Sequence, residues 1–217
     1  DAGEADVWYA APDGEDDGDG SEAEPFGSLS DALEALEPGD TLLVRGGVFR
    51  EDVQPEITPG ERDAPVTVQA YPGERPVIEG LLWLEEPDHW SISGLNVTWS
   101  DENGRRDHMV KFTGGDQWEF TDAEVWGARS YAAILVAGEP SDFRLARLFV
   151  HDTREANDTN QDHLIYLNSG SGGGVVERCV LARSENGRGI KIGAASRSSD
   201  DVENLVIRYN TFYENLG

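Results

Sequence analysis

The sequence predicts a right-handed, single-stranded parallel β-helix: an all-β solenoid with a short capping helix near its N-terminus. Two ladders of apolar residues recur along the chain at one shared period, which indicates coils stacked on one another. The spacings of three and four residues that mark helical repeats are absent from both ladders. We expect one domain over residues 1–217, with the cap and first strand in residues 1–50 and about six coils in residues 51–217.

The segment Ser28–Leu36 predicts the capping helix. It begins with serines, carries apolar residues at helical spacing, and is followed by Pro38-Gly39, which ends it. A solenoid exposes its core at both ends, so a helix here would cover one of them. The first strands are expected at Thr41–Val44 and Val66–Val68.

The first ladder places apolar residues at offsets 0, 2, 5 and 7 of each coil. An offset of two is strand alternation, and the step from two to five is a corner into another strand. Asn210 occupies an inward position of the last set, where its amide can satisfy the backbone of the turn. The five sets are Trp90, Ile92, Leu95, Val97; Trp118, Phe120, Ala123, Val125; Phe143, Leu145, Leu148, Val150; Gly174, Val176, Cys179, Leu181; and Leu205, Ile207, Asn210, Phe212.

A second ladder predicts one more strand in each coil. Its inward pairs are Leu82/Leu84, Val110/Phe112, Ile134/Val136, Ile165/Leu167 and Ile190/Ile192. Stacking these strands in register puts their outward residues in a single row, with neighbouring coils about 4.8 Å apart. The row is Trp83, Lys111, Leu135, Tyr166 and Lys191, and three residues before its later members come His108, Ala132, His163 and Arg188.

The charge of the chain is strongly acidic, with 43 Asp and Glu against 17 Lys and Arg and a formal charge of −26. This balance argues against nucleic acid as a partner. No apolar run approaches 18 residues, so we expect no membrane span. Acid-rich chains suit high salt, where the Debye length falls to about 3 Å at 1 M, so a halophilic source is one explanation. Calcium binding is a second, and an ordinary solvated acidic surface is the third.

Five stretches of the N-terminal third carry a resemblance to secreted pectate lyase-like β-helix proteins. They are Trp8–Gly14, Pro25–Leu29, Pro38–Thr41, Arg45–Phe49 and Val66–Gly80. The resemblance implies the β-helix fold and a secreted, extracellular or cell-surface location. It does not single out an activity, since the superfamily includes lyases, hydrolases, epimerases and non-catalytic adhesins.

The outward row holds both lysines of a chain that is otherwise acidic, which points to an acidic polysaccharide as the partner. In β-elimination a base removes the proton at C5 of a uronate while a cation neutralises the adjacent carboxylate. Lyases of the superfamily use Lys or Arg as that base, often with Ca²⁺ bridging the substrate and acidic ligands. The resemblance therefore implies Lys191 as base, with Arg188, His163 and Tyr166 as charge stabilisers or proton donor, and Lys111, His108 and Trp83 as substrate-binding residues.

A calcium site is predicted in the loop that begins at His151. Its candidate ligands are Asp152, Asp158 and Asp162, although their spacing matches no fixed calcium loop. No cofactor other than Ca²⁺ is expected.

Two other functions stay open. The first is a non-catalytic carbohydrate-binding or structural surface module. We expect no cap after the last coil, so that coil would stack end to end on a second molecule or on further coils. The second is a glycoside hydrolase, since Gly189–Ile192 is similar to a segment of polygalacturonases. The paired acids that hydrolysis requires are missing before it, and Asp200-Asp201 come after the lysine.

Overall fold

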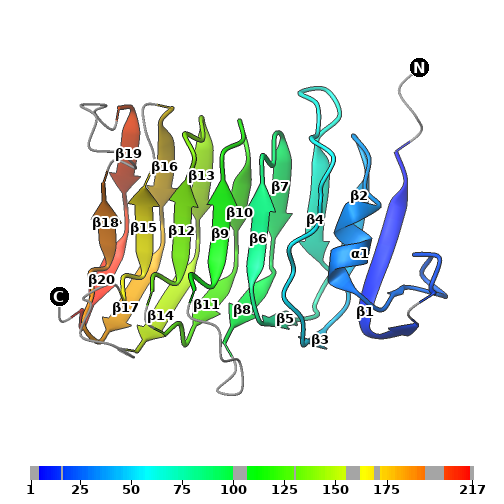
Figure 1. Cartoon of the computed structure of the whole chain (residues 1–217), viewed down its shortest axis with the longest axis horizontal. Coiled ribbons are helices and arrows are strands. Elements are labelled where there is room, and N and C mark those ends of the chain that lie inside the picture. The colour runs from blue at the N-terminus through cyan, green and yellow to red at the C-terminus, as the bar shows by residue number, and fades with distance from the viewer. Residues whose placement is uncertain are drawn as a thin grey trace.

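The computed structural model describes residues 5–15, 17–99, 107–129, 131–154, 162–168, 172–193 and 203–215. Its strands form three parallel sheets that wind around one core, so the predicted parallel β-helix is confirmed (Figure 1). Five turns carry a strand in every sheet, from β4–β5–β6 to β16–β17–β18, with partial turns at each end, against the predicted six or so.

We name the sheets first, second and third in the order in which each turn visits them. The first contains β1 (Val7–Glu15), β2 (Thr41–Val44), β4 (Val66–Ala70), β7 (Trp90–Ser93), β10 (Glu119–Thr121), β13 (Phe143–Ala146), β16 (Gly174–Glu177) and β19 (Leu205–Arg208). The second contains β3 (Gly47–Phe49), β5 (Pro76–Glu79), β8 (Asn96–Thr98), β11 (Glu124–Trp126), β14 (Phe149–Thr153), β17 (Val180–Ser184) and β20 (Thr211–Tyr213). The third contains β6 (Leu82–Glu85), β9 (Val110–Thr113), β12 (Ile134–Ala137), β15 (Ile165–Asn168) and β18 (Ile190–Ile192).

From β7 onward, each turn passes from the first sheet to the second through one residue in the left-handed region. This residue is Gly94, Asp122, Arg147, Arg178 or Tyr209, with φ between 55° and 75°. One positive φ redirects the chain without a loop, which explains the constant step from offset 2 to offset 5.

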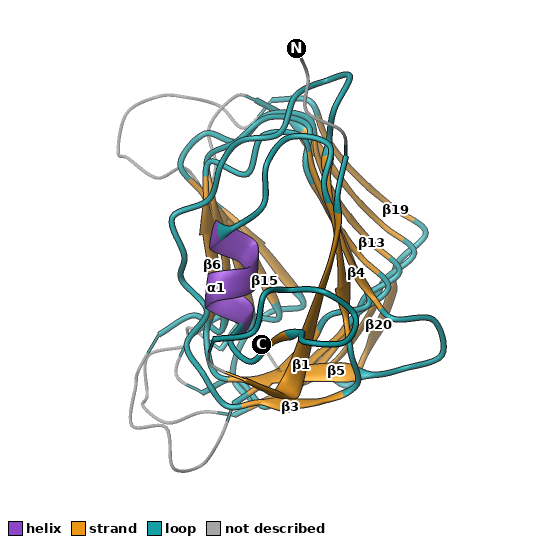
Figure 2. Ribbon diagram, turned by 90° about the vertical axis from the view of Figure 1, so that its right-hand side faces the viewer, coloured by secondary structure: helices purple, strands orange, loops and turns teal. Residues whose placement is uncertain are grey.

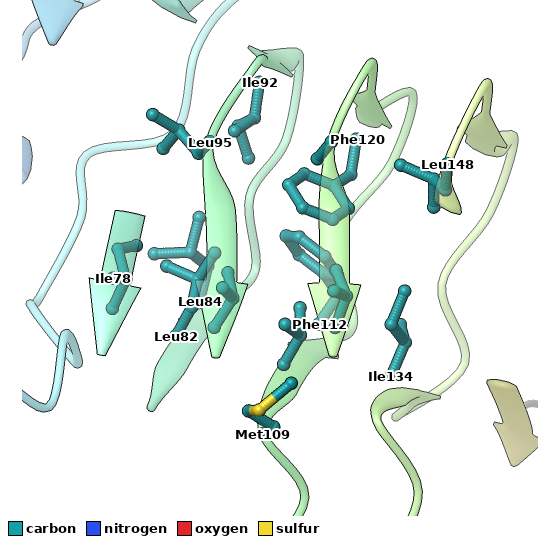
Figure 3. Close-up of a cluster of buried hydrophobic side chains, with 14 of the residues drawn as sticks. Ile78, Leu82, Leu84, Ile92, Leu95, Met109, Phe112, Phe120, Ile134 and Leu148 are labelled. Carbon is teal, nitrogen blue, oxygen red and sulfur yellow. The ribbon is translucent and has the colours of Figure 1, made fainter. Parts of the chain in front are cut away.

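The predicted ladders form the core over four of their five sets, as Figure 3 shows for its central part. Aromatic rings stack along the coil axis, with 4.5 Å between the centroids of Phe112 and Trp118 and 5.3 Å between those of Trp118 and Phe143. The fifth set is an exception, because it lies in the last described turn. There Ile207 is 38% exposed and Phe212 is 53% exposed.

Asparagines bridge successive turns at the corner, as predicted for Asn210. The Cys179 N–H donates to Asn210 Oδ1 at 2.8 Å, and Asn210 Nδ2 donates to the Val176 carbonyl at 2.9 Å. Asn96 plays the same part earlier in the coil and is buried.

The capping helix α1 spans Leu29–Glu34 and is shorter than the predicted Ser28–Leu36. The hydroxyl of Ser28 caps it by accepting the Asp31 N–H, and the Glu51 carboxylate accepts the Leu29 and Ser30 N–H groups. In Figure 2, which looks along the stack, α1 lies at the near end across the opening between the sheets. The helix follows a first strand, β1, that the sequence did not delimit. No helix within the described ranges is long and apolar enough to cross a membrane.

Candidate functional site

The outer face of the third sheet carries the predicted row. Strand pairing puts Trp83 beside Lys111, Lys111 beside Leu135, Leu135 beside Tyr166, and Tyr166 beside Lys191. The sequence register of this row is therefore correct. The strands that supply it, β6, β9, β12, β15 and β18, lie side by side in Figure 1.

The N-terminal part of the row is closed by its own contacts. Lys111 is only 8% exposed, and its Nζ lies 2.8 Å from Asp107 Oδ2 and 4.1 Å from the centre of the Trp83 ring. The indole Nε1 of Trp83 donates to the Thr113 hydroxyl. Burial raises the pKa of Asp107, but the Lys111 ammonium outweighs it and holds that pKa below its ordinary range. This ion pair leaves Lys111 little surface for a ligand.

The C-terminal part of the row gathers a second group, which we call the Tyr166 cluster: His108, Tyr131, His163, Tyr166, Arg188 and Lys191. Lys191 Nζ lies 4.3 Å from the centre of the Tyr166 ring. The rings of His163 and His108 lie 6.0 and 6.4 Å from that of Tyr166. The Arg188 N–H donates to His163 Nδ1 at 3.1 Å, so the predicted neighbours meet.

Both histidines of the cluster are neutral at neutral pH. Burial lowers the pKa of His108 to about 4, with the positive charges of Lys111 and Lys191 acting in the same direction. Burial also lowers the pKa of His163 to about 4, helped by Lys191 and Arg188. Neither imidazole adds positive charge to the face. A neutral His163 can act through hydrogen bonds but cannot neutralise a negative charge. The cations of the cluster are Lys191 and Arg188.

Tyr131 is a member of the cluster that the sequence did not single out. Its ring lies 5.2 Å from the His108 ring, and the residue is 37% exposed. The available signal was its position, since it directly precedes Ala132 in the row that holds the histidines.

The predicted calcium ligands do not converge in the part of the chain that is described. Both oxygens of Asp152 are held by Arg183, and Oδ2 also meets His151. The Arg183 guanidinium lowers the Asp152 pKa to about 2. Asp162 is completely buried, and Asp158 lies outside the described residues. No three His, Cys, Asp or Glu residues within the described ranges group as metal ligands, and the predicted calcium site, which includes Asp158, stays a prediction.

A groove of about 550 Å³ lies beside Asp152. Its walls come from the ends of β14 and β17 and from the last turn, and include Arg154, Arg183, Glu185 and Glu214. Asp152 and Arg183 in its wall are already paired with each other.

The three-sheet coil and its polar outer face define a parallel β-helix of the pectate lyase-like kind. The chain belongs to the Pel9A-like right-handed β-helix family, whose model matches residues 8–162, and the predicted handedness is thereby confirmed.

Curated relatives share part of the sequence. The chain is 30% identical over 118 residues to "Pectate lyase PEL9" of Emericella nidulans, which covers 54% of this chain and 27% of that protein. It is 31% identical over 108 residues to "Uncharacterized protein YwoF" of Bacillus subtilis, covering 44% and 22%. The matched region thus spans about a quarter of these relatives.

Solved structures share the fold. One described as the complex of XylC with xylose superposes with a TM-score of 0.72 at 12% identity, covering 94% of this chain and 58% of that one. Pectate lyase Pel9A superposes with a TM-score of 0.54 at 18% identity, covering 92% and 57%. At these identities the likeness describes the fold alone.

Proposed function

We propose that this chain is the β-helix of an extracellular protein that cleaves an acidic, uronate-containing polysaccharide by β-elimination at the Tyr166 cluster. The observation that carries the proposal is the contact of Lys191 with the Tyr166 ring across two adjacent turns, beside His163, on which the Arg188 charge acts. The formal charge of the chain is −26. A cationic and aromatic face on so acidic a protein suits a polyanionic ligand. The family and the relationship to a pectate lyase support the same class of substrate.

The cluster supplies the groups that β-elimination requires. Lys191 takes the proton from C5 of the uronate, so the C5–H bond breaks and its electron pair forms the C4–C5 double bond. The C4–O bond breaks, and the leaving oxygen receives a proton from the Tyr166 hydroxyl or from water. The Arg188 guanidinium neutralises the uronate carboxylate while charge builds up beside it. A lysine amine accepts a proton only when it is unprotonated, so turnover rises with pH.

Hydrolysis is the weaker alternative on the same face. Glycoside hydrolysis uses two carboxyl groups on opposite sides of the scissile bond, about 5 to 9.5 Å apart. The carboxylates that precede the histidines are Asp107, which is bound to Lys111, and Asp162, which is completely buried. Neither offers the accessible acid that protonates a leaving group.

The test compares the two lysines. Lys191→Ala is expected to lower kcat on polyuronate at least about 100-fold, the contribution of a positioned base. The melting temperature should change little, because Lys191 lies on the outer face.

Lys111→Ala is the matched control and should behave in the opposite way. It removes the partner of Asp107 and the cation over Trp83, so it lowers the melting temperature, while the kcat of the folded protein stays within a few-fold of wild type. Equal and small effects of both substitutions on kcat would contradict the proposal and favour a non-catalytic binding module.

A further inference from the structure

His163 holds a buried hydrogen-bond donor without a partner. The residue is completely buried, and its Nδ1 accepts the backbone N–H of Arg188. A neutral imidazole that accepts at Nδ1 carries its proton on Nε2. This Nε2 has no hydrogen-bond partner within the described part of the chain. Such a group is uncommon in folded proteins and points to a partner that binds there.

His108 holds the complementary group, a buried acceptor. Its Nδ1 is buried and has no partner among the described residues. The ring makes a hydrogen bond with the backbone of Ala132, and this bond raises the pKa of His108. The ring is therefore the donor in that bond. Because Nδ1 is unpartnered, that donor is Nε2, and Nδ1 presents a lone pair.

Both imidazoles border the same side chain. Their ring centres lie 6.0 and 6.4 Å from that of Tyr166, and the ammonium of Lys191 acts on both. The cluster therefore offers one N–H and one lone pair next to the residues proposed to do the chemistry.

We propose that His163 and His108 bind one neutral hydroxyl group of the sugar, with His163 Nε2 donating to the hydroxyl oxygen and His108 Nδ1 accepting the hydroxyl proton. A carboxylate could accept the hydrogen bond from His163. It has no proton to donate to His108 Nδ1, and its lone pairs would repel the lone pair of that nitrogen. A metal ion would suit His108 but would meet the N–H of His163. Only a group that both donates and accepts satisfies the two nitrogens, and a hydroxyl does. The inference rests on the proposed function in that it places the sugar at the Tyr166 cluster.

Tyr131 packs beside one member of this pair. Both nitrogens are closed to solvent, and Tyr131, the cluster ring exposed to 37%, packs on His108 at 5.2 Å. Sugar binding thus requires side chains around the two nitrogens to move, and we expect the partly exposed Tyr131 ring to be one of them. We expect Tyr131→Ala to strengthen the binding of small sugars by removing that requirement.

Side-chain ¹⁵N spectra at neutral pH test the proposal directly. The chain has four histidines, so His89 and His151, which lie outside the cluster, serve as internal controls. The probes are D-xylose, which has hydroxyl groups and no charge, and D-galacturonate, which adds a carboxylate. We expect both probes to shift His163 Nε2 and His108 Nδ1 and to leave the two controls in place.

Two outcomes would overturn the inference: shifts with D-galacturonate alone, which would indicate carboxylate recognition, or no shift at the two nitrogens with either probe. A second comparison uses His163→Gln, which keeps an N–H donor, and His163→Leu, which removes it. Affinity for D-xylose should fall about tenfold in the leucine variant, the loss of roughly one hydrogen bond, and less in the glutamine variant. These readouts measure binding and need no turnover. A protein without activity would therefore refute the elimination chemistry but would leave the test of the proposed hydroxyl-binding site unaffected.

Discussion

Lys111 and Lys191 occupy equivalent positions on β9 and β18, yet their surroundings differ. Strand alternation alone predicted that both side chains point outward in one row. It could not predict that Lys111 pairs with Asp107, four residues before it in the sequence. Nor could it predict that the Lys111 ammonium lies over the Trp83 ring of the previous turn. Such contacts depend on rotamers and loop paths, which the periodicity of a sequence does not encode. The position of a residue in this solenoid was thus predictable, and its exposure was not.

The buried histidines give the first prediction for pH. His108 has an ordinary pKa of 6.5 and a pKa of about 4 in the folded protein. The unfolded chain therefore binds the proton first, and the free energy of unfolding falls as pH drops from about 6.5 to about 4. The loss is on the order of 2–3 kcal/mol. Urea unfolding of wild type and His108→Gln at several pH values measures it.

Comparing wild type with His108→Gln separates the contribution of the histidine from that of the many carboxylates, whose protonation in acid also lowers the free energy of unfolding. The glutamine variant should lose less stability than wild type over this interval. Parallel pH profiles for the two proteins would show that His108 is not buried in its neutral form.

The corners between sheets are the element that holds the register of the coil. A left-handed residue turns the chain, and an asparagine ties that turn to the next. The role of Asn210 was predictable because it broke an otherwise apolar pattern. Asn96 was missed because it stands beside Leu95, so the apolar pattern stayed intact around it. The end of α1 was also misjudged, since the last helical turn opens at Ala35 before Pro38-Gly39 is reached.

The corner at Asn96 gives a second prediction. Its side chain accepts the Glu124 N–H and donates to the carbonyls of Pro76 and Gly94 in a buried setting. Asn96→Ala should lower the free energy of unfolding by about 2–4 kcal/mol, because it leaves buried backbone groups unpaired. Chemical denaturation measures the change.

Asn210→Ala is the matched control for that corner. It removes equivalent bonds in the last described turn, where neighbouring core residues such as Phe212 are exposed, so its cost should be smaller. An Asn96→Ala effect below about 0.5 kcal/mol, typical of a surface site, would contradict the role assigned to this corner.

The molecule as a whole combines a continuous apolar core with an acidic surface. Part of that surface is organised into ion pairs across turns of the first sheet, in the series Glu119, Arg144, Glu177 and Arg208. The fold class followed from the sequence because every turn repeats one pattern, which leaves few alternatives. The pairing of charges did not follow, since it depends on which outward residues of different turns come within reach.

The acidic surface gives a third prediction, on salt. Raising NaCl from about 0.1 to about 1 M shortens the Debye length from about 10 to about 3 Å and screens repulsion among the excess carboxylates. If the charge is an adaptation to high salt, the melting temperature rises markedly over this range. If it reflects calcium sites, Ca²⁺ at millimolar or lower concentration stabilises the protein instead, by binding the folded state. No response to either would contradict both explanations.

The products formed from polysaccharides distinguish β-elimination from hydrolysis and from binding without chemistry. The intact chain is incubated with pectate, with alginate and with a glycosaminoglycan, with and without Ca²⁺, while the ultraviolet absorbance of the unsaturated uronate is followed and reducing ends are counted. The account predicts unsaturated product from at least one of these uronates, with one double bond for each new reducing end and a rate that rises with pH. New reducing ends without unsaturation would show hydrolysis, and neither product from any of the polymers would show a binding or structural module; either result would contradict β-elimination at the Tyr166 cluster.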